Sequence, residues 1–573
     1  MHDLVIRNAQ IADGLGNPLA TGDLAVDGDR VAAVGPVSAE GRKTVDAQGM
    51  VLAPGVIDVH THYDAQLTWD PTASPSPALG VTTVVIGNCG FGIAPIRAES
   101  REKMLADLAE VEGMPLESLQ TGVNWSFESF PEYLDALRRQ GTYPNVAALA
   151  THSTIRAFVM GEDSTKRTAT AEESAEMIRL FHEAMKAGAA GLGSSSNENR
   201  RAAGGTPIGS RLADAEEYRA FAEAMAEYDH GVFMITTGNH MDMAFIKDFA
   251  RRSGRPSIYA AHFYYAHEPD RGRNLMHAAA AARAQGIPAY TQGSCQPLSL
   301  SFPLDAAYIL KAIPPWPGTS DHDELRQIFR DPEFRDAFRT KLATPEQGRT
   351  FNGRWEWVLV TTVGKPENAA LEGKTVAEIA DARGVDPLDL FFDLSLEEGF
   401  KTIFTIYILN MVEEGVEELI TNDGTLISLS DAGAHNSLLC DAAYAMHLFS
   451  HWVREKGVFD LPTAIRKVTS DPADVYGFVD RGRLTEGAYA DMILFDPDKL
   501  RVTGMERHFD LPAGGERLLR RAPGLLGTWV NGVRVFDGEN YLTPERPPGQ
   551  VLTRFSGRQP RLAMSGSGGG SRG

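Results

Sequence analysis

Residues 51–62 read VLAPGVIDVHTH, a short apolar run that ends in two histidines. A step containing Pro and Gly precedes residues 56–59, whose apolar character is typical of a buried strand. Because side chains alternate along a strand, His60 and His62 point the same way at its carboxyl end. Two neutral imidazoles that converge from one strand make half of a metal site. A bare His-X-His pair is also compatible with ordinary polar residues leaving a strand, so the rest of the sequence must decide.

The composition is that of a large globular protein. The chain has 573 residues and a formal net charge of −21 at pH 7, which argues against nucleic acid or an anionic membrane surface as a partner. The three cysteines, Cys89, Cys295 and Cys440, are too few for a disulfide framework. We find no signal-peptide pattern and no apolar run of about 18 residues, so we expect a soluble cytoplasmic protein. Large metabolic enzymes are often symmetric, and a homo-oligomer is compatible with this length.

The two ends of the chain show the same sequence pattern. Short apolar runs separated by Asp-Gly turns fill the first 50 residues, and residues 491–495 and 527–535 repeat the pattern around an Asn-Gly turn. We therefore predict one small β-sandwich domain built from residues 1–54 and 480–550. Residues 551–573 end in a Gly/Ser-rich run and are predicted to be a flexible tail.

Strands and helices alternate through the middle of the chain, residues 55–479, and this predicts a TIM-like (β/α)8 barrel, an α/β fold. The expected strands are 81–86, 146–149, 191–192, 231–235, 257–259 and 426–429, and the expected helices include 171–187, 214–229 and 275–285. A doubly wound sheet is the alternative, but no glycine-rich phosphate motif follows a strand. Residues 300–395 interrupt this strand–helix alternation and contain several prolines and tryptophans. They predict an insertion that forms either a lid or an apolar pocket.

Polar residues follow several predicted strands at the end where a barrel places its active site. They are Cys89, His152, His262, Asp431 and His435. Each also has an ordinary interpretation: a small buried thiol, a histidine bonded to backbone, or an aspartate that caps a helix. Nitrogen and thiolate ligands favour zinc, and an aspartate beside a metal-bound water can pass a proton to a leaving amine. Together they predict metal-dependent hydrolysis of a carbonyl–nitrogen bond.

Four stretches resemble the amidohydrolase superfamily and, within it, the D-aminoacylase (N-acyl-D-amino-acid deacylase) group. They are residues 54–64, 80–90 (with Asn-Cys-Gly), 430–435 (Ser-Asp-Ala-Gly-Ala-His) and 481–491, and they occur in the expected order along nearly the whole chain. The resemblance implies a zinc-dependent TIM-like barrel with one or two zinc ions, and cleavage of an N-acyl group from an amino acid. It implies His60 and His62 as ligands of one metal position, Cys89 and His262 as ligands of the other, and Asp431 as the catalytic acid/base that also contacts metal.

The sequence departs from this pattern after residues 231–235. The group carries a further histidine ligand there, whereas this chain has Thr236, with His240 a few residues later. Either His240 replaces that ligand, or the second metal site is altered or lost. No basic residue follows the 430–435 motif to bind a substrate carboxylate, and His152 and His435 remain candidate substrate-binding residues. The small-molecule substrate is therefore a linear N-acyl amide or, alternatively, a cyclic amide, a carbamate or a bulky aromatic amide. A non-catalytic metal-binding scaffold is the minor alternative.

Overall fold

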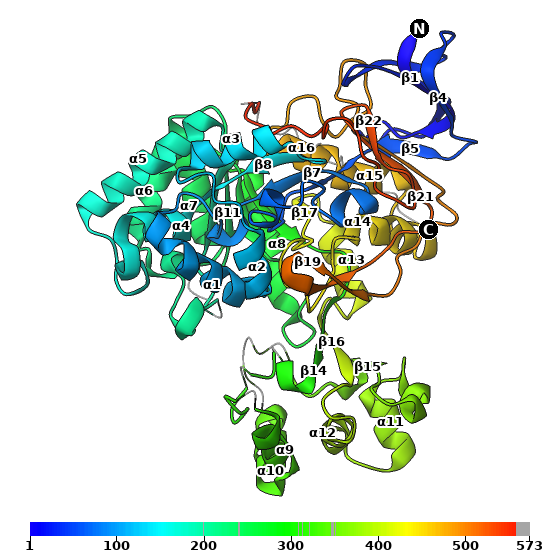
Figure 1. Cartoon of the computed structure of the whole chain (residues 1–573). Coiled ribbons are helices and arrows are strands. Elements are labelled where there is room, and N and C mark those ends of the chain that lie inside the picture. Colours follow the sequence, from blue (N-terminus) through cyan, green and yellow to red (C-terminus); the bar gives the residue numbers. More distant parts are fainter. Residues whose placement is uncertain are drawn as a thin grey trace, which may run out of the picture.

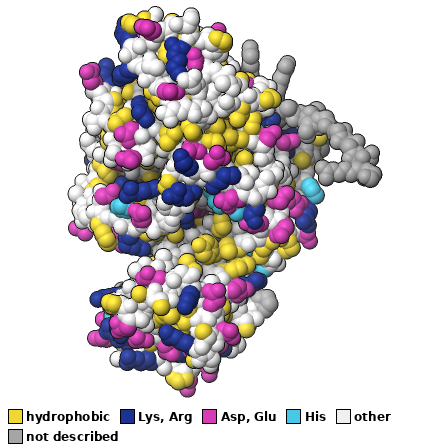
Figure 2. Space-filling model, turned by 90° about the vertical axis from the view of Figure 1, so that its right-hand side faces the viewer, with side chains coloured by type: hydrophobic (Ala, Val, Ile, Leu, Met, Phe, Trp, Pro, Cys, Tyr) yellow, Lys and Arg dark blue, Asp and Glu magenta, His cyan; other side chains and the backbone are white. Residues whose placement is uncertain are grey.

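The structure is a computed structural model, and it shows a main body that carries a sheet at one end and a separate lobe below (Figure 1). It describes residues 1–198, 200–238, 241–307, 309–311, 313–319, 321–344, 346, 349 and 351–556. None of the helices in these ranges has the length and apolar character of a membrane span. Acidic and basic side chains are interspersed over the face shown in Figure 2, where the lower lobe is the narrower part.

Both ends of the chain contribute strands to one eight-stranded sheet, which has the order β22-β21-β18-β5-β1-β2-β3, with β4 paired to β1. The strands are β1 (His2–Ile11), β2 (Ala20–Asp27), β3 (Arg30–Gly35), β4 (Gly41–Asp46), β5 (Val51–Pro54), β18 (Met492–Phe495), β21 (Leu525–Val530) and β22 (Val533–Phe536). The antiparallel pairing of β5 with β18 joins the two ends of the chain. Alternate residues of β1, such as Leu4 and Ile6, bury their side chains with Leu24 and Met492. These strands thus form one mixed hydrogen-bonded sheet, and its form as a sandwich stays a prediction.

Parallel strands form the main body in two sheets, ordered β6-β7-β8 and β17-β13-β12-β11-β10-β9. The strands are β6 (Val56–Asp58), β7 (Val81–Ile86), β8 (Asn145–Ala148), β9 (Ala150–Thr151), β10 (Gly191–Ser195), β11 (Val232–Thr236), β12 (Ser257–Ala260), β13 (Ala289–Gly293) and β17 (Thr425–Ile427). The sheets meet at both margins. Leu149 alone separates β8 from β9, and a parallel bridge joins Thr61 to Ala432 on the other side. The described pairing therefore gives two joined parallel sheets instead of one continuous barrel ladder.

Amphipathic helices pack around these strands (Figure 1). They are α1 (Arg101–Val111), α2 (Leu116–Gly122), α3 (Phe130–Gln140), α4 (His152–Met160), α5 (Ala171–Ala187), α6 (Ala215–Ala226), α7 (Met243–Ser253), α8 (Pro269–Arg283), α13 (Glu413–Thr421), α14 (Tyr444–His447), α15 (Leu461–Val468) and α16 (Ser470–Tyr476). Helix α5 begins where sequence reasoning placed it, because Thr170 and Glu173 form a capping box. Met177 and Phe181 of α5 lie one helical turn apart and are buried.

The insertion is the lower lobe of Figure 1. It contains β14 (Leu298–Pro303), α9 (His322–Arg330), α10 (Pro332–Ala343), β15 (Val358–Thr362), α11 (Val376–Arg383), α12 (Pro387–Glu397) and β16 (Ile403–Leu409). Trp316 lies 5.2 Å from Phe329 and 5.3 Å from Phe338 between ring centroids and packs against the core of this lobe. The insertion thus has its own core, and its role as a lid or as an apolar pocket stays a prediction.

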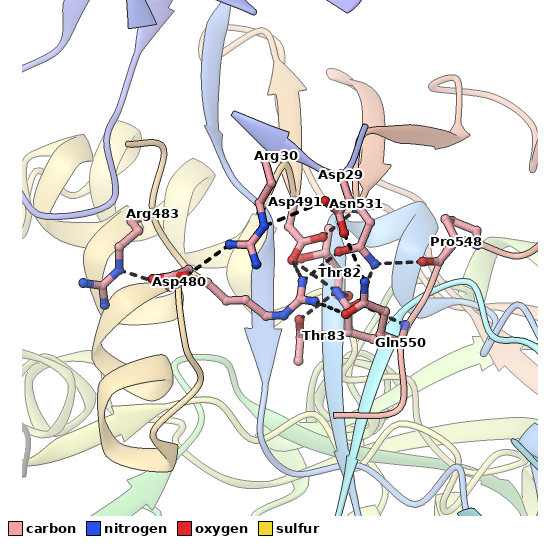
Figure 3. A network of polar contacts seen from close by, with 12 residues as sticks. Asp29, Arg30, Thr82, Thr83, Asp480, Arg483, Asp491, Asn531, Pro548 and Gln550 are labelled. Atoms are coloured by element: carbon pink, nitrogen blue, oxygen red, sulfur yellow. Dashed lines mark hydrogen bonds and ion pairs between the residues drawn. The ribbon is translucent and has the colours of Figure 1, made fainter. Parts of the chain in front are cut away.

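A buried polar network joins the terminal sheet to the main body (Figure 3). Arg481 forms an ion pair with Asp491, and both side chains are nearly inaccessible. Asn145 of β8 donates to Asp491, and Gln550 accepts from Arg481. The segment after Gln550 continues along the body, where Val551 bridges Val146. Val551 and Phe555 thus form bridges with the body, and the predicted tail beyond residue 556 lies outside the described residues.

Candidate metal centre

His60 and His62 leave the carboxyl end of β6 on the same side, as the period of a strand requires. Their ring centroids are 5.5 Å apart, and the two residues are 1% and 2% exposed. Gln292 of β13 fixes the ring of His60: its amide nitrogen donates to the carbonyl of Ser428, so its oxygen accepts from Nδ1 of His60 at 2.8 Å. Nδ1 therefore carries the proton, and Nε2 presents a lone pair to the site.

Cys89 reaches the same place from the end of β7. The turn after β7 needs glycine at residue 87, where φ is 82° and a Cβ would lie 2.5 Å from the carbonyl oxygen of Leu149. This tight turn places Sγ of Cys89 3.4 Å from Nε2 of His60. The donor atoms of His60, His62 and Cys89 all lie within 4.8 Å of one another.

Asp431 approaches from the strand end after β17. Its backbone N–H donates to the carbonyl of His60, which brings the two strand ends together. Oδ1 of Asp431 lies 3.3 Å from Nε2 of His60 and 3.4 Å from Nε2 of His62. The Asp431 side chain is 19% exposed, whereas both histidine side chains are 2% exposed. Asp431 is thus the accessible member of the group, where a substrate would arrive.

These donors have the spacing that a tetrahedral metal ion requires. Two ligands about 2.1 Å from a zinc ion at a tetrahedral angle are about 3.4 Å apart. Nε2 of His60 lies 3.3 Å from Oδ1 of Asp431 and 3.4 Å from Sγ of Cys89. Nε2 of His62 and Oδ1 of Asp431 are buried and have no hydrogen-bond partner among the described residues, as expected for atoms whose partner is a cation. The residues fit a zinc ion.

Electrostatics also favours a cation at this point. Burial raises the pKa of Cys89, but the positive charges of Arg200 and His60 outweigh it and lower the pKa to about 6. Burial likewise raises the pKa of Asp431, but His62 and His60 outweigh it and hold the pKa well below its usual range. The thiolate and the carboxylate therefore predominate near neutral pH.

Glu112 and Arg200 also belong to this site, and sequence reasoning missed both. Glu112 follows α1 and is fully buried; its Oε2 lies 3.7 Å from Nε2 of His62. Its Oε1 accepts from Nη1 of Arg200 at 2.6 Å. A glutamate at the end of a charged helix carries no signal in the sequence, because such residues usually face solvent.

His262 is not brought into this group. It follows β12, and its backbone N–H donates to the carbonyl of Gln292. Its ring lies against Gly272 of α8, where a Cβ would be 3.1 Å from Nε2. Neither ring nitrogen has a hydrogen-bond partner among the described residues, and burial lowers the pKa of His262 to about 4. Its role as a ligand stays a prediction.

The remaining predicted site residues differ in their surroundings. His152 is buried with both nitrogens engaged, Nδ1 with Ser194 at 2.9 Å and Nε2 with Glu217 at 2.7 Å, which favours a structural role over substrate binding. His435 is only partly buried, and its backbone N–H donates to the carbonyl of Glu112. His240 lies outside the described residues.

Thr236 ends β11 at the position where sequence reasoning expected a histidine. Its Oγ1 lies 3.0 Å from Sγ of Cys89, at hydrogen-bond distance. A threonine hydroxyl is a weaker ligand for zinc than an imidazole nitrogen. The site as described therefore has one compact set of donors around His60, His62 and Cys89.

A family model, two relatives and a solved structure each match most of this chain. A model of the Amidohydrolase family matches residues 43–325 and 359–536. The D-aminoacylase of Alcaligenes xylosoxydans xylosoxydans is 30% identical over 565 residues, which cover 96% of this chain and 98% of that protein. The N-acyl-D-aspartate deacylase of the same organism is 30% identical over 554 residues, with coverages of 96% and 95%. A solved D-aminoacylase, described with a binuclear metal center, superposes with a TM-score of 0.65 at 25% identity, covering 97% of this chain and 100% of that chain.

Proposed function

The chain belongs to the Amidohydrolase family, and from this premise we propose that it is a zinc-dependent deacylase of N-acyl-D-amino acids or similar linear amides. Family membership and the two deacylase relatives make it a hydrolase of carbon–nitrogen bonds other than peptide bonds. The observation that carries the proposal is the convergence of His60, His62 and Cys89 within 4.8 Å. Asp431 stands beside them at 3.3 Å from His60.

His60, His62 and Cys89 would hold the zinc ion, and Asp431 would lie beside it. When bound, zinc lowers the pKa of a water molecule and polarises the substrate carbonyl. Asp431 is ionised near neutral pH, so its carboxylate can accept a proton from the attacking water. The same carboxyl can then donate that proton to the amine nitrogen as the carbon–nitrogen bond breaks. Gln292 keeps the lone pair of His60 directed at the site throughout.

The proposal includes the form of the catalytic domain. We propose that the two parallel sheets close into one (β/α)8 barrel within residues 55–479, completed by the terminal sheet of residues 1–54 and 480–550. The bridge from Thr61 to Ala432 and the bond from the Leu149 N–H to the carbonyl of Ile86 support closure at the two margins. In a barrel, the ends of β6, β7 and β17 share the catalytic face.

Amine release from a panel of N-acyl-D- and N-acyl-L-amino acids tests the proposal, with zinc per chain measured on the same sample. We expect hydrolysis of at least one N-acyl-D-amino acid, and loss of both zinc and activity in His60→Ala. A cyclic amide and an aromatic amide belong in the panel as competing substrates. Zinc-loaded protein that releases no amine from any N-acyl amino acid would refute the substrate assignment.

A further inference from the structure

We infer that Glu112 is an additional ligand of the proposed metal ion, contributed from the end of α1 and oriented by Arg200. The inference rests on the proposed function, because it concerns the same metal position. Glu112 is fully buried, and its Oε2 has no hydrogen-bond partner among the described residues. An isolated buried carboxylate oxygen costs several kcal/mol of free energy unless a charge compensates it.

The direction of the carboxylate distinguishes its two oxygens. Oε1 of Glu112 accepts a hydrogen bond from Nη1 of Arg200 at 2.6 Å. This bond leaves Oε2 turned toward Nε2 of His62, at 3.7 Å. That separation is close to the distance of about 3.4 Å expected between two neighbouring zinc ligands, and a five-coordinate zinc ion holds Glu112 as well as water.

Two carboxylates flank the same imidazole nitrogen. Oδ1 of Asp431 lies 3.4 Å and Oε2 of Glu112 lies 3.7 Å from Nε2 of His62. All three atoms are buried without a hydrogen-bond partner among the described residues. A single proton on Nε2 points along one direction and can serve only one carboxylate. A metal ion placed between the three atoms would satisfy all of them.

The charges of the donor group also favour a divalent cation. With Cys89 as a thiolate, the group contains three negative charges, from Cys89, Asp431 and Glu112. Arg200 supplies one positive charge next to Glu112. When they ligate a metal, His60 and His62 are neutral, so the group carries a net charge of minus two, which a divalent cation neutralises. Without Glu112 the same ion would leave an excess positive charge in a buried site.

Glu112→Gln tests the inference, because the amide keeps the shape of the side chain but is a poor ligand for zinc. Zinc affinity is measured by competition with a chelator, and the coordination shell by X-ray absorption at the zinc edge. We expect Glu112→Gln to weaken zinc binding about tenfold or more and to lose one oxygen neighbour of the zinc. Glu217→Gln is the matched control, since Glu217 is a buried glutamate paired with Arg156 and His152, away from the donor group.

A coordination shell and zinc affinity in Glu112→Gln equal to those of the unaltered protein would overturn the inference. If Glu112→Gln does not fold, Glu112→Asp replaces it, because the shorter side chain keeps the charge near Arg200 but withdraws the oxygen from the metal. The same loss of an oxygen neighbour is then expected. Unaltered protein that binds no zinc refutes the proposed function as well, whereas zinc-binding, active protein with an unaffected Glu112→Gln variant refutes this inference alone.

Discussion

Replacement of Arg481 by methionine should destabilise the fold by about 3 kcal/mol, near the lower end of the range for breaking a buried ion pair. Arg481 and Asp491 are 2% and 3% exposed at their side chains. Arg481 also donates to Asn531 and to Gln550, each at 3.0 Å (Figure 3). Methionine fills a similar volume, so the loss is mainly electrostatic.

The remaining partners of Asp491 set the magnitude. After the replacement, Asp491 still accepts from the Asn145 side chain at 3.1 Å and from the Asn531 backbone N–H at 2.8 Å. Two of its hydrogen bonds therefore survive, and the carboxylate is not left bare. The cost should stay near 3 kcal/mol and not reach the upper value of about 5 kcal/mol.

Urea unfolding followed by circular dichroism measures this change in the free energy of unfolding. Arg483→Met is the matched control: it lies two residues away and pairs with Asp474, but the two side chains are 27% and 42% exposed. We expect the control to cost about 0–1 kcal/mol. In the double variant Arg481→Met/Asp491→Asn, the loss should be smaller than the sum of the two single losses, because no buried charge remains unpaired. Equal destabilisation by Arg481→Met and Arg483→Met would refute the reasoning.

Three further outcomes follow from the site and its surroundings. Asp431→Asn should lower kcat by about 10²- to 10⁴-fold in an amine-release assay; unchanged kcat would remove Asp431 from the mechanism. Chelation of zinc should abolish hydrolysis and zinc should restore it; activity that survives complete metal removal would exclude a metal-dependent reaction. Burial lowers the pKa of His152 despite its bond to Glu217, so the folded protein takes up that proton less readily than the unfolded chain. Stability should therefore fall as pH drops below about 6.5, with a smaller pH slope in His152→Asn; an identical slope in both proteins would contradict this.

The strand-end rule predicted that His60, His62, Cys89 and Asp431 lie close together, as the structure shows, because it depends only on local sequence. His60 and His62 follow the same strand, and Cys89 and Asp431 each follow an apolar run, so an assumed parallel sheet places them together. The same rule also selected His152, whose substrate-binding role stays a prediction. That histidine also follows a strand, but it begins α4 and turns its ring toward Glu217 of α6.

The residues that sequence reasoning missed are those whose role depends on a neighbour from a distant segment. Gln292 is an unremarked polar residue in a strand until its bond to Nδ1 of His60 is seen. Glu112 and Arg200 lie in segments 88 residues apart and meet only in the folded chain. The buried pair of Arg481 with Asp491 likewise depends on the sheet that brings Asn531 beside it.

The same distinction applies to Thr236 and Glu112. A ligand that ends a barrel strand is held by the sheet, so its replacement is visible in the sequence as a change at a fixed position. Glu112 instead approaches Nε2 of His62 from a helix end, and its ion pair with Arg200 directs the carboxylate. If Glu112 is a ligand, loss of Arg200 should weaken zinc binding while leaving the oxygen neighbour in place. If Arg200→Met keeps the zinc–oxygen distance but has a higher Kd for zinc, then Glu112 is the ligand and Arg200 only orients it.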